Sequence, residues 1–134
     1  MRINSAKELE VYKKSYALAM DIFEASKAFP AEEKYALTGQ IRRSSRSVAM
    51  NLREAWTKRL YEAHLVSKLT DCDGENSETD TSLDFARDCN YLTDAQHLDF
   101  TSRNREVGRM LGSMINNPRP FLVTSEVRGR RSDI

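Results

Sequence analysis

The 134-residue sequence has few helix-breaking residues, few residues that could form covalent cross-links, and no long apolar run. It holds five glycines, three prolines and two cysteines, Cys72 and Cys89, whose separation matches no metal-binding spacing. No apolar run approaches the roughly 20 residues of a membrane span, and the N-terminal MRINSAKELE lacks the apolar core of a signal peptide. We therefore expect one helical domain, with both thiols free, in a reducing, cytoplasmic compartment.

The sequence also lacks an excess of charge of either sign. Twenty-one lysines and arginines face 20 aspartates and glutamates, which gives a formal net charge of +1. A chain this close to neutral is not a polycation that coats nucleic acid. Binding of RNA or DNA would need a local basic patch.

Apolar residues recur at intervals of three and four along most of the chain, and no sustained strand-like alternation is present. This period predicts four helices, over residues 5–29, 31–58, 61–89 and 93–116, with Thr93 or Asp94 as the last N-cap. Short connections between four amphipathic helices favour an all-α, antiparallel up-and-down four-helix bundle over residues 1–118. Residues 119–134 lack a period and are rich in arginine, which predicts a flexible basic tail.

Two of the predicted helices have features that bear on packing. The first has a wide apolar face made of two adjacent stripes, Leu9, Tyr12, Tyr16, Met20 and Phe23 beside Leu18, Ile22, Ala25 and Phe29. The third has one inner stripe with two polar members, Asn76 and Thr79, in its middle: Leu65, Leu69, Cys72, Asn76, Thr79, Leu83 and Ala86. We expect both helices to turn these faces toward the core.

Motifs for catalysis or metal binding do not meet their spacing requirements. The acidic segment DCDGENSETDTSLD has Asn76, and not glycine, at the sixth position that a calcium-binding EF-hand loop needs. Glu62 and His64 miss the Glu-x-x-His spacing of a di-iron bundle. The sequence therefore predicts a protein that is not an enzyme, with no catalytic residue, cofactor, metal or small-molecule substrate.

The segment TGQIRRSSRSVAMN concentrates arginines in the predicted second helix. At 100° per residue, Arg42, Arg46 and Arg53 fall within about 40° of one another, and Arg43 lies off that row. The third helix is acidic, with Glu75 and Glu78 beside its polar seam. These opposite charges leave three interpretations open.

In the first interpretation, Arg42 and Arg46 form structural ion pairs with Glu75 and Glu78, within one chain or between subunits. In the second, the basic residues bind the phosphates of a nucleic acid, and the candidate set is Arg42, Arg43, Arg46, Arg53, Lys58 and Arg59. In the third, the arginines are simply solvated. The first two interpretations can hold together.

The segment LEVYKKSYALAMDIFEASKAFPAEEKYALTGQIRRSSRSVAMNLREAW, most specifically KYALTGQIRR, resembles four-helix-bundle proteins encoded in intervening sequences of bacterial 23S ribosomal RNA. The resemblance extends over about residues 8–117, through SKLTDCDGENSETDTSLDFARDCNYL and EVGRMLGSMIN. Members often have a proline in the second helix, where this chain has Ala49. We therefore expect no proline kink at that position.

The resemblance implies a bundle that assembles as a homopentameric ring. A related bundle, the accessory variability determinant of diversity-generating retroelements, forms a similar ring, binds nucleic acid and associates with a reverse transcriptase. We therefore expect a non-enzymatic homo-oligomer, a pentamer, that binds RNA or DNA through an arginine-rich surface. The alternative is a protein-interaction scaffold whose arginines serve self-assembly, for example with a reverse transcriptase-like partner.

Overall fold

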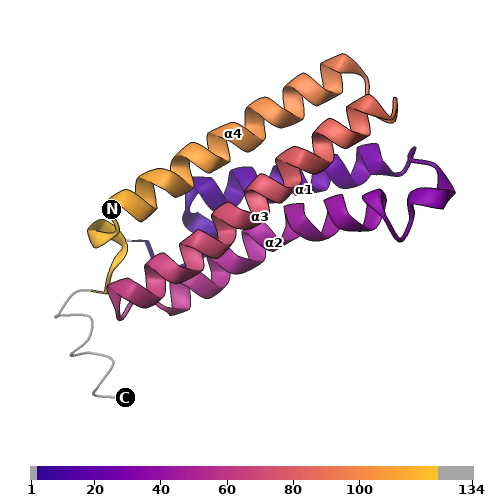
Figure 1. Cartoon of the computed structure of the whole chain (residues 1–134). Coiled ribbons are helices and arrows are strands. Elements are labelled where there is room, and N and C mark those ends of the chain that lie inside the picture. Colours follow the sequence, from indigo (N-terminus) through magenta and orange to yellow (C-terminus); the bar gives the residue numbers. More distant parts are fainter. Residues whose placement is uncertain (1–2, 124–134) are drawn as a thin grey trace.

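The computed structural model describes residues 3–123, and this part of the chain forms four α-helices. They are α1 (Glu10–Ser26), α2 (Leu37–Thr57), α3 (Glu62–Asp88) and α4 (Asp94–Asn116). Short 3-10 turns precede α1 (η1, Ala6–Glu8), precede α2 (η2, Ala31–Glu33) and follow α4 (η3, Arg119–Phe121). The connections alternate between the two ends of the molecule, so neighbouring helices run antiparallel (Figure 1). The predicted all-α bundle is confirmed.

Local sequence signals explain where the helices begin and end. Pro30 follows the end of α1, and Thr93 caps α4 by accepting a hydrogen bond from the backbone N–H of Gln96. Ser5 caps η1 rather than α1, so the first helix begins later than the period suggested. As expected from alanine, rather than proline, at position 49, α2 continues without interruption to Thr57.

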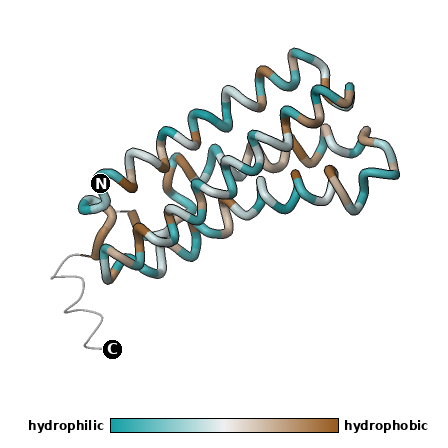
Figure 2. The backbone as a smooth tube through the Cα atoms, viewed as in Figure 1, coloured by the Kyte–Doolittle hydropathy of each residue, from teal (hydrophilic) through white to brown (hydrophobic). Residues whose placement is uncertain are grey.

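The helices bury one face each, and hydrophobic and hydrophilic residues alternate along every helix (Figure 2). All seven members of the predicted inner stripe of α3 are buried. On α1, the stripe of Leu18 and Ile22 is buried, whereas Tyr16 and Met20 are 54% and 43% exposed. The expectation that both stripes of α1 face the core is therefore wrong for Tyr16 and Met20.

Two apolar clusters fill the core, one toward each end of the bundle. The first contains Leu52, Leu69 and Leu111, and the second contains Ile22, Ile41 and Leu83. Cys72 belongs to the first cluster, and burial raises the pKa of its thiol to about 12. Cys89 is exposed, and neither cysteine forms a disulfide.

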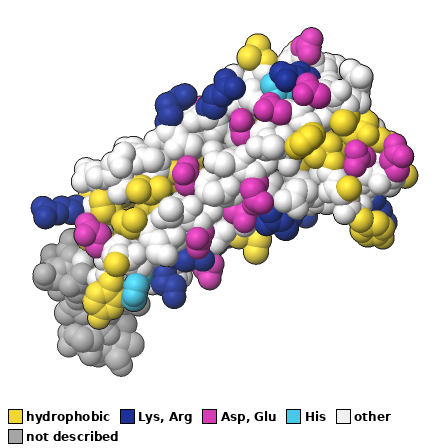
Figure 3. Space-filling model, viewed as in Figure 1, with side chains coloured by type: hydrophobic (Ala, Val, Ile, Leu, Met, Phe, Trp, Pro, Cys, Tyr) yellow, Lys and Arg dark blue, Asp and Glu magenta, His cyan; other side chains and the backbone are white. Residues whose placement is uncertain are grey.

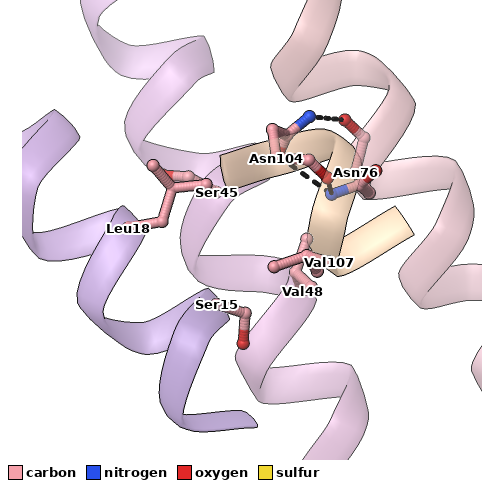
Figure 4. Close-up of a pocket in the computed structure, with 7 residues that line it drawn as sticks. All are labelled: Ser15, Leu18, Ser45, Val48, Asn76, Asn104 and Val107. Carbon is pink, nitrogen blue, oxygen red and sulfur yellow. Dashed lines mark hydrogen bonds between the residues drawn. The ribbon is translucent and has the colours of Figure 1, made fainter. Parts of the chain in front are cut away.

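A polar layer separates the two clusters. Asn76 of α3 donates to the side-chain and backbone oxygens of Asn104 on α4, at 2.9 and 3.1 Å, and Asn104 donates back to the Asn76 carbonyl at 2.9 Å (Figure 4). Beside this pair, Thr79 donates to the hydroxyl of Ser44 on α2 at 2.9 Å. Because buried polar groups are costly without partners, this layer favours a single register of α2, α3 and α4.

Residues after α4 continue to pack against the bundle. Val123 is buried, and its backbone N–H donates to the carbonyl of Arg59 at 3.1 Å. The predicted tail of 119–134 therefore begins with an ordered turn, because Phe121, Leu122 and Val123 supply apolar side chains. Residues 124–134 lie outside the described part of the chain. No helix between residues 3 and 123 has the length and apolar character that crossing a bilayer requires.

Two glycines of α4 allow the contribution of the polar layer to be tested with a matched pair of substitutions. A Cβ added at Gly108 would lie 2.9 Å from Oδ1 of Asn76, whereas one added at Gly112 would meet nothing within 4 Å. Replacing a helical glycine by alanine ordinarily adds up to about 1 kcal/mol. We expect Gly112→Ala to gain that free energy of unfolding, and Gly108→Ala to be at least about 1 kcal/mol less stable than Gly112→Ala because the amide pair is displaced. Urea denaturation of both variants measures the difference, and equal stabilities would contradict the constraint.

Candidate nucleic-acid interface

The buried face of α2 determines where its four arginines point. Ile41, Ser44, Val48 and Leu52 are buried along this face. Residues on its two sides turn toward different neighbours, since successive residues of a helix are 100° apart. Arg43 accordingly lies on the side of α3, and Arg42 lies on the side of α1.

On the α3 side, Arg43 binds two carboxylates at once. One guanidinium nitrogen lies 3.1 Å from Glu75 and the other lies 3.0 Å from Glu78, and Gln40 also donates to Glu78 at 3.4 Å. The hydrogen bonds to these carboxylates raise the pKa of Arg43, and Glu75 with the guanidinium lowers the pKa of Glu78. The network is present at neutral pH, and its contribution falls as the pH drops through the folded-state pKa of Glu78.

The prediction that Arg42 and Arg46 pair with these two carboxylates is wrong within the chain. The acidic partners are as predicted, but the arginine is Arg43. The physical reason is the phase of α2, because burial of Ile41 and Ser44 rotates Arg42 and Arg46 away from α3. Since Arg43 is half exposed, this pairing contributes little to stability.

On the α1 side, Arg42 is a structural residue. Its Nε donates to the hydroxyl of Ser26, a buried residue of α1, at 2.7 Å. Its guanidinium lies 4.7 Å from the ring centre of Phe23. Arg42 therefore joins α2 to α1 through a hydrogen bond and a cation–π contact.

The ring of Phe23 has two more cations near it. Arg46 lies 5.2 Å from the ring centre, and Lys27 lies 5.0 Å from it. Lys27 also pairs with Glu24, whereas Arg46 is exposed and makes no ion pair with any described residue. Three cationic side chains therefore lie around the ring of Phe23, at the edge of α1 that faces α2.

A groove of about 450 Å³ continues this edge between α1 and α2. Arg46 and Arg53 line it together with apolar side chains, of which Tyr16, Met20 and Met50 are exposed, and none of its lining residues is acidic. Tyr12, Tyr16, Ala19 and Met20 come from α1, and Ala49 and Met50 come from α2. Within residues 3–123, Arg53 likewise has no ion-pair partner. We call these residues, with Phe23, the α1–α2 face.

The end of α2 carries the last two predicted basic residues. Arg59 lies over the ring of Trp56 at 3.6 Å and donates to the Trp56 carbonyl at 2.8 Å, so it is held against the protein. Lys58 is the exposed C-cap of α2. Neither residue lines the α1–α2 face.

The aromatic members of the α1–α2 face were not among the predicted site residues. Tyr16, Met20 and Phe23 were assigned to the core because helical period alone treats every apolar residue alike. Their residue types could have indicated otherwise, since tyrosine combines an apolar ring with a polar hydroxyl and methionine is frequent at adaptable binding surfaces.

The face over α3 has the opposite charge. Acidic side chains gather along it in the space-filling view (Figure 3). Several of them are paired, with Asp84 2.8 Å from Nε2 of His97 and Asp71 3.3 Å from Lys68. Between residues 3 and 123, no group of three metal-ligating side chains converges on one point.

Taken together, these features define an all-α bundle with an acidic face over α3 and a basic, aromatic face between α1 and α2. The chain belongs to the family of 23S rRNA-intervening sequence proteins, whose family model matches residues 7–113. It is also similar to the crystal structure of a protein of unknown function from the S23 ribosomal protein family of Bacteroides thetaiotaomicron. That similarity has 29% identity and a TM-score of 0.72, and it covers 80% of this chain and 96% of the other. The search of curated proteins gives no match.

The two classes of arginine predict different effects on stability. Arg42→Ala removes the hydrogen bond to Ser26 and the contact with Phe23, and we expect it to lower the free energy of unfolding by about 1–2 kcal/mol. Arg53→Ala removes an exposed side chain without an ion pair, and we expect a change within about 0.5 kcal/mol. Urea denaturation compares the two variants. Equal losses of the free energy of unfolding would contradict the distinction between Arg42, which joins two helices, and Arg53, which does not.

Proposed function

We propose that this protein is a non-enzymatic, self-associating helical bundle that binds nucleic acid through the α1–α2 face. The binding residues are Arg46 and Arg53, with Arg42 extending the positive charge beside them, whereas the nearby Lys27 is paired with Glu24. Arg43 belongs to the contact between α2 and α3. Lys58 and Arg59 extend the positive charge past the end of α2.

The observation that carries this proposal is the absence of acidic residues among those lining the groove. Elsewhere in the described range, several basic side chains of the bundle form ion pairs with carboxylates, as Arg43, Lys68 and Arg103 do. Arg46 and Arg53 do not, so their charge is available to phosphate oxygens. Guanidinium groups suit that role because they donate two hydrogen bonds in parallel.

Self-association would multiply this local charge. In a homopentamer, as the family resemblance implies, the three arginines Arg42, Arg46 and Arg53 become about fifteen positive charges around one axis. A subunit with a net charge of +1 could then present a strongly positive surface. The nucleic-acid-binding ring of diversity-generating retroelements supports this proposal by analogy.

The second candidate is a protein-interaction scaffold, and a separate surface favours it. A groove between α2 and α3 is lined by Leu37, Glu78 and Phe85, and by Tyr35, which is 90% exposed. Glu78 is already paired with Arg43, so this groove offers its exposed aromatic side chains, rather than free negative charge, to the apolar side chains of the α1–α2 face. Contact between one copy's α1–α2 face and the next copy's α2–α3 groove would be heterologous, which is the geometry that closes rings. In that case the arginines would serve assembly.

Light scattering with and without RNA tests both candidates together. We expect a solution mass of several subunits, with a further rise when an RNA stem-loop is added at low salt. Titration against salt should give a log–log slope of about −2 to −3 or steeper, because at least three phosphates are neutralised. Lack of RNA binding at low salt would exclude the first candidate.

A double substitution distinguishes the two candidates. For Arg46→Gln with Arg53→Gln we expect a slope shallower by about 1 to 2 units and weaker RNA binding, with the solution mass unchanged. The matched control is Arg105→Gln with Arg109→Gln, which removes the same charge from exposed positions on α4. Loss of the oligomer in the first variant, but not in the control, would assign the arginines to self-assembly instead.

A further inference from the structure

The α1–α2 face exposes more apolar surface than phosphate binding requires. Tyr16, Met20 and Met50 are 54%, 43% and 69% exposed, and all three line the groove beside Arg46 and Arg53. Contacts to the backbone of a duplex need only cationic and polar donors. The exposed aromatic and thioether groups therefore indicate a ligand that offers apolar surface together with negative charge.

Unpaired nucleotides have this combination of properties. Each carries a phosphate and a base whose π-face is free to stack, whereas the base faces inside a duplex are covered by neighbouring bases. Proteins that bind single strands combine a cationic groove with aromatic side chains for this reason. We propose that the ligand of the α1–α2 face is single-stranded nucleic acid, with a base stacked on Tyr16. This inference rests on the proposed function.

The spacing of the groove residues fits one strand running along the helices. Arg46 and Arg53 are seven residues apart on α2, which is two turns or about 10 Å, so each can bind a different phosphate of the same strand. Across from them, Tyr12 and Tyr16 form a tilted pair with ring centres 6.1 Å apart. Tyr16 is the more exposed of the two, which is why the stacked base is assigned to it.

The structure also holds this edge in place before any ligand arrives. Phe23 packs under Arg42 and Arg46, and the Arg42–Ser26 hydrogen bond fixes α1 against α2. A preformed groove loses less conformational entropy on binding than a flexible one. An acidic amphipathic helix of a protein could also use an apolar, cationic groove, and the test below separates this case.

The test compares a labelled single-stranded 12-mer RNA with its blunt duplex by fluorescence anisotropy at one salt concentration. We expect the wild-type protein to bind the single strand about tenfold or more tightly than the duplex. Tyr16→Leu keeps an apolar side chain but removes the π-face. It should weaken single-strand binding about tenfold while changing duplex binding less than about twofold.

Two further variants serve as controls. Tyr16→Phe keeps the ring and should bind as the wild type does. Tyr35→Leu makes the same change at an exposed tyrosine outside the α1–α2 face and should leave both affinities unchanged. Because Tyr16→Leu removes no charge, the salt dependence of its binding should also match the wild type.

Each contrary outcome has a distinct meaning. Equal binding of single strand and duplex, or equal effects of Tyr16→Leu and Tyr35→Leu, would overturn the single-strand inference and leave the proposed function standing. Failure of the wild type to bind either RNA at low salt would overturn both. A fall in solution mass for Tyr16→Leu alone would show that the groove holds protein, which also overturns the inference.

Discussion

The burial of one face of α2, along which Ser44 contacts Thr79 of α3, is the constraint on which the arrangement of this surface depends. Ser44 and Thr79 have no exposed surface, and each hydroxyl also lies within hydrogen-bond distance of a backbone carbonyl of its own helix. Burial of Ser44 together with Ile41, Val48 and Leu52 fixes the rotation of α2 about its axis. With Ser44 directed inward, neighbouring arginines on α2 necessarily point toward different helices.

That rotation gives one run of arginines two kinds of surroundings. Arg43 meets the carboxylates of α3 and is neutralised there, whereas Arg46 and Arg53 reach a groove without acidic residues. A chain with a net charge of +1 thereby acquires separate acidic and basic faces. The separation is a matter of geometry, because the same residues rotated by one position would bring Arg42 to the acids.

Helical period and capping signals were enough to predict the four helices and the polar seam at Asn76 and Thr79. They could not predict which arginine meets Glu75 and Glu78, because Arg42 and Arg43 flank the same buried stripe and the arrangement of neighbouring helices decides between them. Nor could they separate the core stripe of α1 from Tyr16 and Met20, since a wide apolar face has the same period whether or not all of it is buried. The missed residues are the ones that give the proposed site its aromatic character.

Mapping of photo-cross-links is the most direct test of whether the α1–α2 face is the ligand-binding surface. Single-stranded RNA carrying photoreactive nucleotides would be cross-linked to the full-length protein, and the modified peptides identified by mass spectrometry. Cross-links should concentrate in residues 12–23 of α1 and 46–53 of α2. Cross-links confined to α3, α4 or the C-terminal residues would contradict the assignment of this face.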